Sequence, residues 1–140
     1  MSQKGNDPKR GLYASVNVVV NDKATTAVQS TQQLALWYKG PFDGRPNDSI
    51  GFGIANYVVN DRYKDRQIAL NNSRGYDEYD AFAADYVPVQ RDELNIELNY
   101  TYQWSPAVML RPNLQYIHQP AGVKEVDDAW VAGLSMRVNF

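Results

Sequence analysis

Hydrophobic and polar residues alternate along four segments of this chain. Side chains of a β-strand point to the two faces of a sheet in turn, so the alternation predicts four strands, each with one apolar and one polar face. The apolar positions are Leu12, Ala14, Val16, Val18 and Val20; Leu94, Ile96, Leu98, Tyr100, Tyr102 and Trp104; Val108, Leu110, Pro112, Leu114 and Tyr116; and Trp130, Ala132, Leu134, Met136, Val138 and Phe140.

Two further segments predict strands from a weaker pattern. Their apolar positions are Leu34, Leu36 and Tyr38 in one and Ile50, Phe52 and Ile54 in the other. The first follows a stretch at residues 29–33 that is polar on both sides, and in the second the alternation slips at Asn56 and Tyr57, as a β-bulge would cause. The sequence therefore predicts six antiparallel strands in series, and no segment predicts a long helix.

The connections between these strands differ greatly in length. Ser105 and Pro106 form a tight turn, and residues 21–23 and 119–122 mark two more turns. Residues 60–91 instead form one loop of about 30 residues, which is long for a compact soluble domain. Long loops on one side and short turns on the other are typical of outer-membrane β-barrels.

Three features indicate that the apolar face meets lipid. The predicted strands have about 10–13 residues, near the ~9–11 that cross a bilayer. The apolar faces of the four clear strands carry no charged side chain, and Arg or Lys there would cost ~2–4 kcal/mol at the bilayer midplane. Aromatic side chains lie towards the strand ends, where membrane girdles are found. The predicted girdle residues are Trp104, Trp130, Tyr102, Tyr116 and Phe140.

Composition narrows the class of protein further. The mean hydropathy is -0.54, and no apolar run approaches the ~18 residues of a transmembrane helix. The net charge of -2 gives no reason to expect a nucleic-acid partner. The chain has no cysteine, which excludes disulfides and thiolate metal sites, and neither a metal nor a cofactor is expected.

The C-terminal half resembles a known family. Residues 97–119 read ELNYTYQWSPAVMLRPNLQYIHQ, followed by Pro-Ala-Gly at 120–122 and by Trp-Val-Ala-Gly-Leu at 130–134 before Phe140. This stretch resembles the C-terminus of the carbohydrate-selective outer-membrane porins of the OprB family. The resemblance is strong over residues 91–140, weaker over 11–63 and absent over 72–85.

The resemblance implies an all-β fold, here about six C-terminal strands of a larger transmembrane antiparallel barrel. Such porins are sixteen-stranded barrels in the outer membrane of Gram-negative bacteria and pass monosaccharides by passive diffusion. Six strands do not close a barrel, for which about eight are needed, and open edges are not stable in hydrocarbon. We therefore expect a part of a longer chain, with residues 1–140 belonging to a single porin barrel; edges paired with another chain are the alternative.

The polar faces supply the candidate pore-lining and substrate residues. They are Arg111, Arg137, Glu97, Asn99, Asn113, Gln115 and Trp37. If the last two strands pair with residue numbers that sum to about 248, Arg111 and Arg137 lie opposite each other. Their donors, with the neighbouring carboxylate and amides, would bind sugar hydroxyls; ordinary wall residues joined by salt bridges are the alternative. Trp37 would stack on a sugar or, if its strand slips in register, join the girdle.

Other motifs carry less weight. His118 is the only histidine, is expected beside Trp130 and is interpreted as an interface residue. The acidic run at 77–80, with Asp85, has oxygen ligands for calcium but not the spacing of a calcium loop, which favours a solvated acidic loop. The Gly-Phe-Gly at 51–53 lacks the helix that a nucleotide-binding loop needs.

The end of the chain suggests orientation and a partner. An alternating strand that closes on aromatic Phe140 resembles the signal read by the barrel-insertion machinery, which places Phe140 on the periplasmic side. Residues 60–91 are then extracellular, and the connection at 39–48 is periplasmic. The remaining expected partners are carbohydrate solutes, outer-membrane lipid and the other strands of the barrel.

One alternative class stays open from the residues alone. A soluble lipocalin-like β-barrel would turn the same apolar face inwards around a small apolar ligand. Purification without detergent would separate this alternative from a membrane barrel. An enzyme is not expected, because the sequence shows no nucleophile with a neighbouring base and no cluster of metal ligands.

Overall fold

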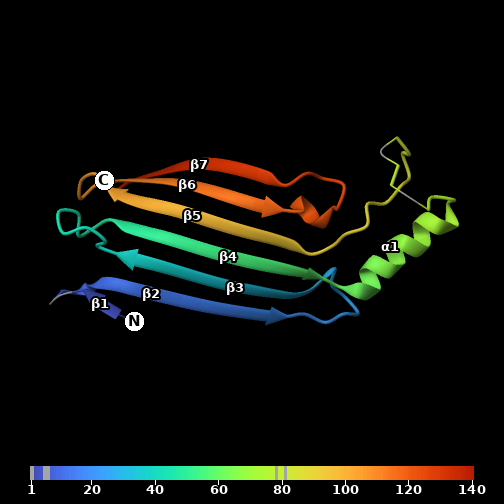
Figure 1. Cartoon of the computed structure of the whole chain (residues 1–140), viewed down its shortest axis with the longest axis horizontal. Coiled ribbons are helices and arrows are strands. Elements are labelled where there is room, and N and C mark those ends of the chain that lie inside the picture. Colours follow the sequence, from blue (N-terminus) through green and yellow to red (C-terminus); the bar gives the residue numbers. More distant parts are fainter. Residues whose placement is uncertain (1, 5–6, 78, 81) are drawn as a thin grey trace.

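The fold is one antiparallel sheet in which every strand pairs with the next strand along the chain (Figure 1). The computed structural model describes residues 2–4, 7–77, 79–80 and 82–140. The strands are β1 (Ser2–Lys4), β2 (Asp7–Val20), β3 (Val28–Lys39), β4 (Ser49–Val59), β5 (Glu93–Gln103), β6 (Val108–His118) and β7 (Ala129–Val138). The six predicted strands are β2 to β7, and the short β1 is an addition that alternation did not predict.

The two ends of the sheet carry different connections. The loop end, on the right in Figure 1, carries residues 21–27, 60–92 and 119–128, and the turn end carries residues 40–48 and 104–107. At the turn end, Ser105 and Val108 exchange backbone hydrogen bonds, which confirms the predicted tight turn. At the loop end, a 3-10 turn, η1 (Pro120–Gly122), lies at the predicted turn after β6.

The register of the strands keeps like side chains together on each face. One cross-strand row runs through Ala14, Leu36, Phe52, Leu98, Leu114 and Ala132. A slip of one residue would move a whole strand's apolar set to the opposite face, so rows of this kind fix the register wherever one face is apolar. The predicted faces of all six long strands are therefore those of the structure.

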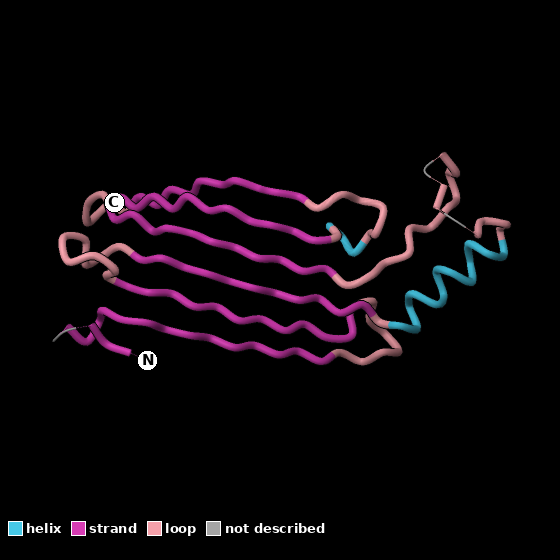
Figure 2. Tube along the Cα trace, viewed as in Figure 1, coloured by secondary structure: helices cyan, strands magenta, loops and turns pink. Residues whose placement is uncertain are grey.

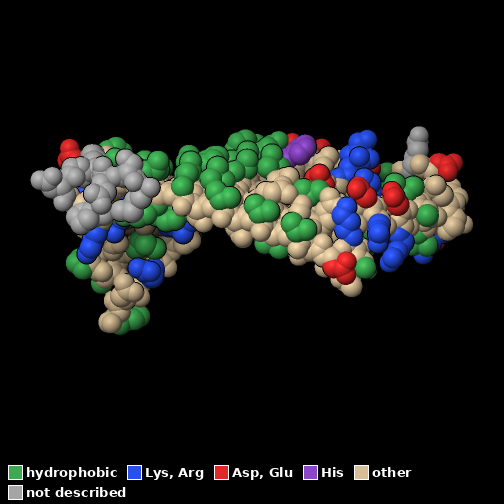
Figure 3. All heavy atoms as spheres, turned by 90° about the horizontal axis from the view of Figure 1, so that it is seen from below, with side chains coloured by type: hydrophobic (Ala, Val, Ile, Leu, Met, Phe, Trp, Pro, Cys, Tyr) green, Lys and Arg blue, Asp and Glu red, His purple; other side chains and the backbone are tan. Residues whose placement is uncertain are grey.

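No described part of the chain forms a layer over the apolar face. Among the described residues, no hydrophobic side chain is buried, and Val16, Leu134 and Met136 are about 70% exposed, at 72%, 71% and 67%. Figure 3 shows hydrophobic side chains gathered in a strip along one side of the sheet, with most charged side chains at the loop end. A soluble monomer rarely leaves so large an apolar surface in water, so this face needs lipid or another apolar partner.

Helix α1 (Asp61–Ser73) corrects the prediction of a loop without a helix at residues 60–91. It lies beyond the loop end of the sheet (Figure 2). Alternation and amphipathicity did not reveal it, because the two side chains that it buries are the amides of Gln67 and Asn71 rather than apolar groups. No helix in the described part of the chain is long and apolar enough to cross a membrane.

A single buried side chain starts this helix. Asn60 is 1% exposed, and its side-chain oxygen accepts a hydrogen bond from the Arg62 N–H at 3.0 Å, as an N-cap residue does. Its amide nitrogen donates to the carbonyls of Lys23 and Thr26, at 2.7 and 2.8 Å. Asn60 thus joins the start of the helix to the connection between β2 and β3.

The predicted bulge at Asn56 and Tyr57 was wrong. β4 pairs regularly with β5 there, as Asn56 with Leu94 and Tyr57 with Glu93. Asn56 stays on the apolar face and donates a hydrogen bond to Gln32, its cross-strand partner, at 3.0 Å. The alternation seemed to slip because this face becomes polar towards the loop end, and the irregularity lies instead where Val28 and Ser30 pair with β4.

Candidate functional site

The polar face of β5 and β6 brings five of the predicted site residues into one cluster. Glu97 pairs with Gln115, and Asn99 pairs with Asn113, across the two strands. Arg111 lies on the same face, two residues before Asn113. We name these five residues, Glu97, Asn99, Arg111, Asn113 and Gln115, the Glu97 cluster.

The Glu97 carboxylate is the acceptor that holds this cluster together. Asn99 Nδ2 donates to Glu97 Oε1 and Gln115 Nε2 donates to Glu97 Oε2, both at 2.8 Å. Arg111 Nη2 lies 3.6 Å from Glu97 Oε1, with both side chains partly exposed. The cluster therefore combines a compensated negative charge, a positive charge and three amides on a surface that water reaches.

The predicted pairing of the two arginines was wrong. β6 and β7 pair with residue numbers that sum to 246, so Arg111 lies opposite Ser135, and Arg137 lies opposite Met109. The shift of two residues keeps each arginine on the polar face but separates the like charges, which destabilise a sheet when directly opposite. Alternation fixes the face of a side chain, whereas its partner depends on the connection at 119–128.

Beside the cluster, the polar face is hollowed into a groove of about 600 Å³. Its floor consists of small residues on β3 and β4, namely Ala35, Gly51, Gly53 and Ala55. Trp37 lines one side and Glu97, Asn99, Arg111 and Gln115 line the other. Arg137 and Asn113 are not among the lining residues.

Trp37 lies on the polar face, as predicted without a slip, and has an aromatic partner that the sequence did not single out. Trp37 pairs with Tyr13 on β2 and with Gly51 on β4. The rings of Tyr13 and Trp37 are stacked, with centroids 5.5 Å apart and planes 8° from parallel. Alternation places Tyr13 on the polar face, but only the β2–β3 register shows that it meets the indole.

The predicted girdle residues lie at both ends of the apolar face. Tyr102, Trp104 and Phe140 lie at the turn end, where Trp104 and Phe140 are just beyond their strands. Tyr116 and Trp130 form a cross-strand pair at the loop end, with ring centroids 5.0 Å apart. The structure therefore places them at the two levels that a pair of aromatic girdles would occupy.

His118 is not beside Trp130, which corrects the prediction. The register that separates the arginines places Tyr116 there instead, and His118 Nδ1 lies 2.8 Å from the carboxylate of Asp128. Tyr116 Oη donates to the same carboxylate at 2.5 Å. The hydrogen bonds from Tyr116, from the Gln119 N–H and from His118 lower the pKa of Asp128.

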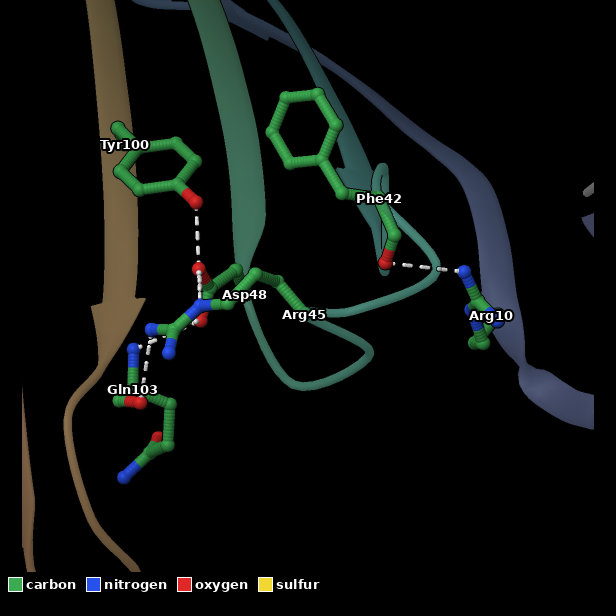
Figure 4. A network of polar contacts seen from close by, with 6 residues as sticks. All are labelled: Arg10, Phe42, Arg45, Asp48, Tyr100 and Gln103. Carbon is green, nitrogen blue, oxygen red and sulfur yellow. Dashed lines mark hydrogen bonds and ion pairs between the residues drawn. The ribbon is translucent and has the colours of Figure 1, made fainter.

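A polar network at the turn end was not predicted at all (Figure 4). Arg45 donates to both carboxylate oxygens of Asp48, at 2.8 and 3.1 Å, and to the carbonyl of Gln103 at 3.1 Å. Tyr100 Oη and the Gln103 N–H also donate to Asp48, which is 1% exposed. The network ties the connection at 40–48 to β5, which explains how a long turn is accommodated at this end.

This network shifts the pKa of the Asp48 carboxyl group. Burial alone would raise the pKa of its carboxyl group. The hydrogen bonds from Arg45, Tyr100 and Gln103, with the charge of Arg45, outweigh burial and lower the pKa below its ordinary value. Arg10 supports the same connection from β2, since it donates to the carbonyls of Gly40 and Phe42.

The structure describes the acidic run of the long connection except for one residue. Glu78 lies outside the described residues, and Asp85 accepts a hydrogen bond from Tyr76 Oη at 2.8 Å. Within the described residues, no group of three or more His, Cys, Asp or Glu side chains is arranged to hold a metal ion.

Comparison with known proteins gives one consistent result. The family model described as carbohydrate-selective porin, OprB family, matches residues 1–140. The chain is 79% identical over 140 residues to the candidate porin QuiX of Acinetobacter baylyi, covering 100% of this chain and 32% of that protein. It is 49% identical over 134 residues to Porin B of Pseudomonas aeruginosa, covering 96% of this chain and 29% of that protein.

Two solved structures of Pseudomonas putida OprB are also similar. The high-pH structure has a TM-score of 0.94 at 46% identity, and the low-pH structure has a TM-score of 0.66 at 34% identity. Each similarity covers 100% of this chain and 33% of the solved one. The chain thus spans about a third of the length of these relatives.

Proposed function

The chain belongs to the OprB family of carbohydrate-selective porins, and from this premise we propose that it forms part of the wall of a passive diffusion channel for monosaccharide-type solutes. It is an outer-membrane protein of Gram-negative bacteria, and its open antiparallel sheet is part of a β-barrel. Because the family model covers all 140 residues, the lipocalin-like alternative is set aside. The activity proposed is diffusion through a channel rather than catalysis.

One observation carries the proposed direction of the two faces. The apolar face carries no Asp, Glu, Lys or Arg from Leu12 to the end of β2, nor anywhere in β3 to β7. Glu97, Arg111 and Arg137 all lie on the other face. A charged side chain on a lipid face costs ~2–4 kcal/mol at the midplane, and one on a lumen face does not. We therefore assign the apolar face to lipid and the polar face to the lumen.

The lumen assignment gives the site residues their roles. The Glu97 cluster, Arg137 and Trp37 line the channel and offer donors, acceptors and an aromatic face to a passing sugar. The predicted aromatic residues form the girdles at the two membrane interfaces. The remaining proposed partners are lipid, the other strands of the barrel and the insertion machinery, which would read the apolar alternation of β7.

The loop end is the extracellular end in this proposal, and the turn end is periplasmic. Long connections on the extracellular side and short turns on the periplasmic side are usual in outer-membrane barrels. Residues 60–92, including α1, then form an extracellular loop. Residues 40–48 form a periplasmic connection, and the Asp48 network keeps it compact.

Swelling of proteoliposomes tests the channel function directly. The intact barrel that contains this segment, reconstituted in vesicles, is expected to admit D-glucose quickly and a trisaccharide at least about tenfold more slowly, because passage through a pore falls steeply with solute size. Empty vesicles are the control for leakage. Equal swelling rates for the two solutes, or no swelling above that of empty vesicles, would contradict the proposal.

A further inference from the structure

We propose that the groove over Gly53 is a binding subsite for a pyranose ring, with Trp37 as the stacking platform and with Glu97, Asn99, Arg111 and Gln115 as the hydroxyl-binding wall. The inference rests on the proposed channel function and goes beyond it. It assigns a place in the wall where a sugar pauses, and it names the ring form of the sugar as the ligand.

The register gives the Trp37 indole an aromatic neighbour on one side and a glycine on the other. In one cross-strand row, the neighbours of Trp37 are Tyr13 on β2 and Gly51 on β4. Tyr13 covers the indole on its side by stacking at 5.5 Å. Gly51 has no side chain, so nothing on β4 covers the other side, and Trp37 is 39% exposed. Tyr13 thus holds the indole from one side, and the partly exposed Trp37 lines the groove.

The groove is open over Gly53 but not over Gly51. Neighbouring strands are ~4.8 Å apart, so β3 and β5 are about 10 Å apart across β4, which leaves room for one flat ring between their side chains. A Cβ at Gly51 would lie 2.6 Å from Asn99 Oδ1, which shows that the Asn99 amide leans over Gly51 towards the indole. A Cβ at Gly53 would meet no atom within 4 Å, so the open part of the groove is over Gly53.

The far wall has the hydrogen-bonding groups that a sugar needs. Glu97 lies directly opposite Gly53 in the next strand and offers only acceptors. Arg111 offers only donors, and Asn99 and Gln115 offer both. Asn99, Gln115, Asn113 and Arg111 already engage the Glu97 carboxylate. Arg111 is partly exposed and has five N–H donors, so it supplies the main free donors of this wall.

The indole on one side of the groove and the polar side chains on the other favour a sugar ring over an open-chain polyol. A pyranose presents weakly positive C–H groups on its flat face, which suit the negative face of an indole, and hydroxyls around its rim. An open-chain polyol has the same hydroxyls but no flat C–H face. The volume of about 600 Å³ lies within the ~300–1,000 Å³ of small-molecule sites. Because the groove is open, binding is expected to be weak and release fast, as conduction requires.

Current noise in single channels of the intact barrel tests the subsite. D-glucose is expected to cause brief, saturable interruptions of the ion current, and D-mannitol at the same concentration is expected to cause none. Gly53→Val places a side chain in the open part of the groove, where its Cβ meets no atom within 4 Å, and should abolish the interruptions. Trp37→Leu removes the platform and should weaken glucose binding about three- to tenfold.

Ser15→Val is the matched control. Ser15 lies in the same cross-strand row as Gly53, two strands away, on the polar face and outside the groove, and it is exposed. This variant should keep the interruptions unchanged, and heat-modifiable migration on gels should show that all three variants form barrels. Equal glucose affinity in wild type and Gly53→Val, or equal interruptions by glucose and mannitol, would overturn the subsite. Failure of D-glucose to enter vesicles that contain the wild-type barrel would instead contradict the channel function.

Discussion

At the residue scale, two carboxylates organise their surroundings in different ways. Glu97 lies on the water-accessible face and joins two amides and an arginine. Asp48 is 1% exposed and receives hydrogen bonds from Arg45, Tyr100 and the Gln103 N–H. An exposed pair of this kind adds little stability, whereas a buried carboxylate that loses its donors leaves unsatisfied groups behind. Asp48 is therefore the residue whose titration should affect the structure.

The turn end is expected to loosen in acid. Because the pKa of Asp48 is lower in the folded protein than its ordinary value of 3.8, the ionised carboxylate stabilises the turn at any pH above that value. This stabilisation is lost as the pH falls through the still lower folded pKa. The protection of the Gly40 and Gln103 amides, taken as the ratio of the intrinsic to the measured exchange rate, should therefore be constant from neutral pH down to about 4 and fall below that pH.

Asp48→Asn mimics the protonated state at neutral pH. It should speed exchange of the same two amides at pH 7, by an amount that corresponds to about 1–3 kcal/mol. Asp43→Asn is the matched control, because Asp43 is 86% exposed in its ion pair with Arg10 and should cost little. Unchanged exchange in Asp48→Asn, or equal effects of the two substitutions, would show that the network does not hold the turn.

At the scale of elements, the hydrophobic pattern of the sequence predicts the strands but not the helix. β2 and β5 to β7 each have one mainly apolar and one mainly polar face, so their alternation is regular and the sequence predicts them correctly. Helix α1 meets the rest of the chain through amides: Asn71 exchanges hydrogen bonds with the main chain of Val87, and Gln67 accepts one from the Gln90 N–H. No apolar period marks such a helix.

The same contrast explains the errors in the predicted site. The face of Arg111, Arg137 and Trp37 follows from alternation within one strand. The separation of Arg111 from Arg137 follows from the fold of residues 119–128, and the stacking of Tyr13 on Trp37 follows from pairing across residues 21–27. The network around Asp48 joins the connection at 40–48 to β5, and its partners Asp48 and Tyr100 are 52 residues apart in sequence. Periodicity carries no information on contacts of these kinds.

Helix α1 should depend on Asn60. Asn60→Ala removes the N-cap and leaves the carbonyls of Lys23 and Thr26 without their buried donor, which should cost about 2–4 kcal/mol locally. Proteolysis within residues 60–92 of the folded barrel should then be much faster than in wild type. Asn60→Asp keeps the cap but not the two donated bonds, and an intermediate rate is expected. Wild-type resistance in Asn60→Ala would contradict this role.

At the scale of the whole molecule, the sheet is a wall without a core. Most of its hydrophobic side chains lie on a face that no described part of the chain covers. From Leu12 onward, the Asp, Glu, Lys and Arg side chains of the long strands lie on the other face. A soluble domain would bury the first face, and a membrane wall presents it to lipid. The central claim is therefore about direction: odd-numbered residues of β5 to β7 face the lumen, and even-numbered residues face lipid.

Site-directed spin labelling of the intact barrel tests this direction most directly. The segment has no cysteine, so single cysteines at Leu98, Leu134, Asn99 and Ser135 each give one label in it. Labels at the two leucines should be relaxed mainly by oxygen, which concentrates in lipid. Labels at Asn99 and Ser135 should be relaxed mainly by a water-soluble nickel chelate that enters the channel. The reverse pattern, or equal access to both reagents at all four positions, would contradict the account.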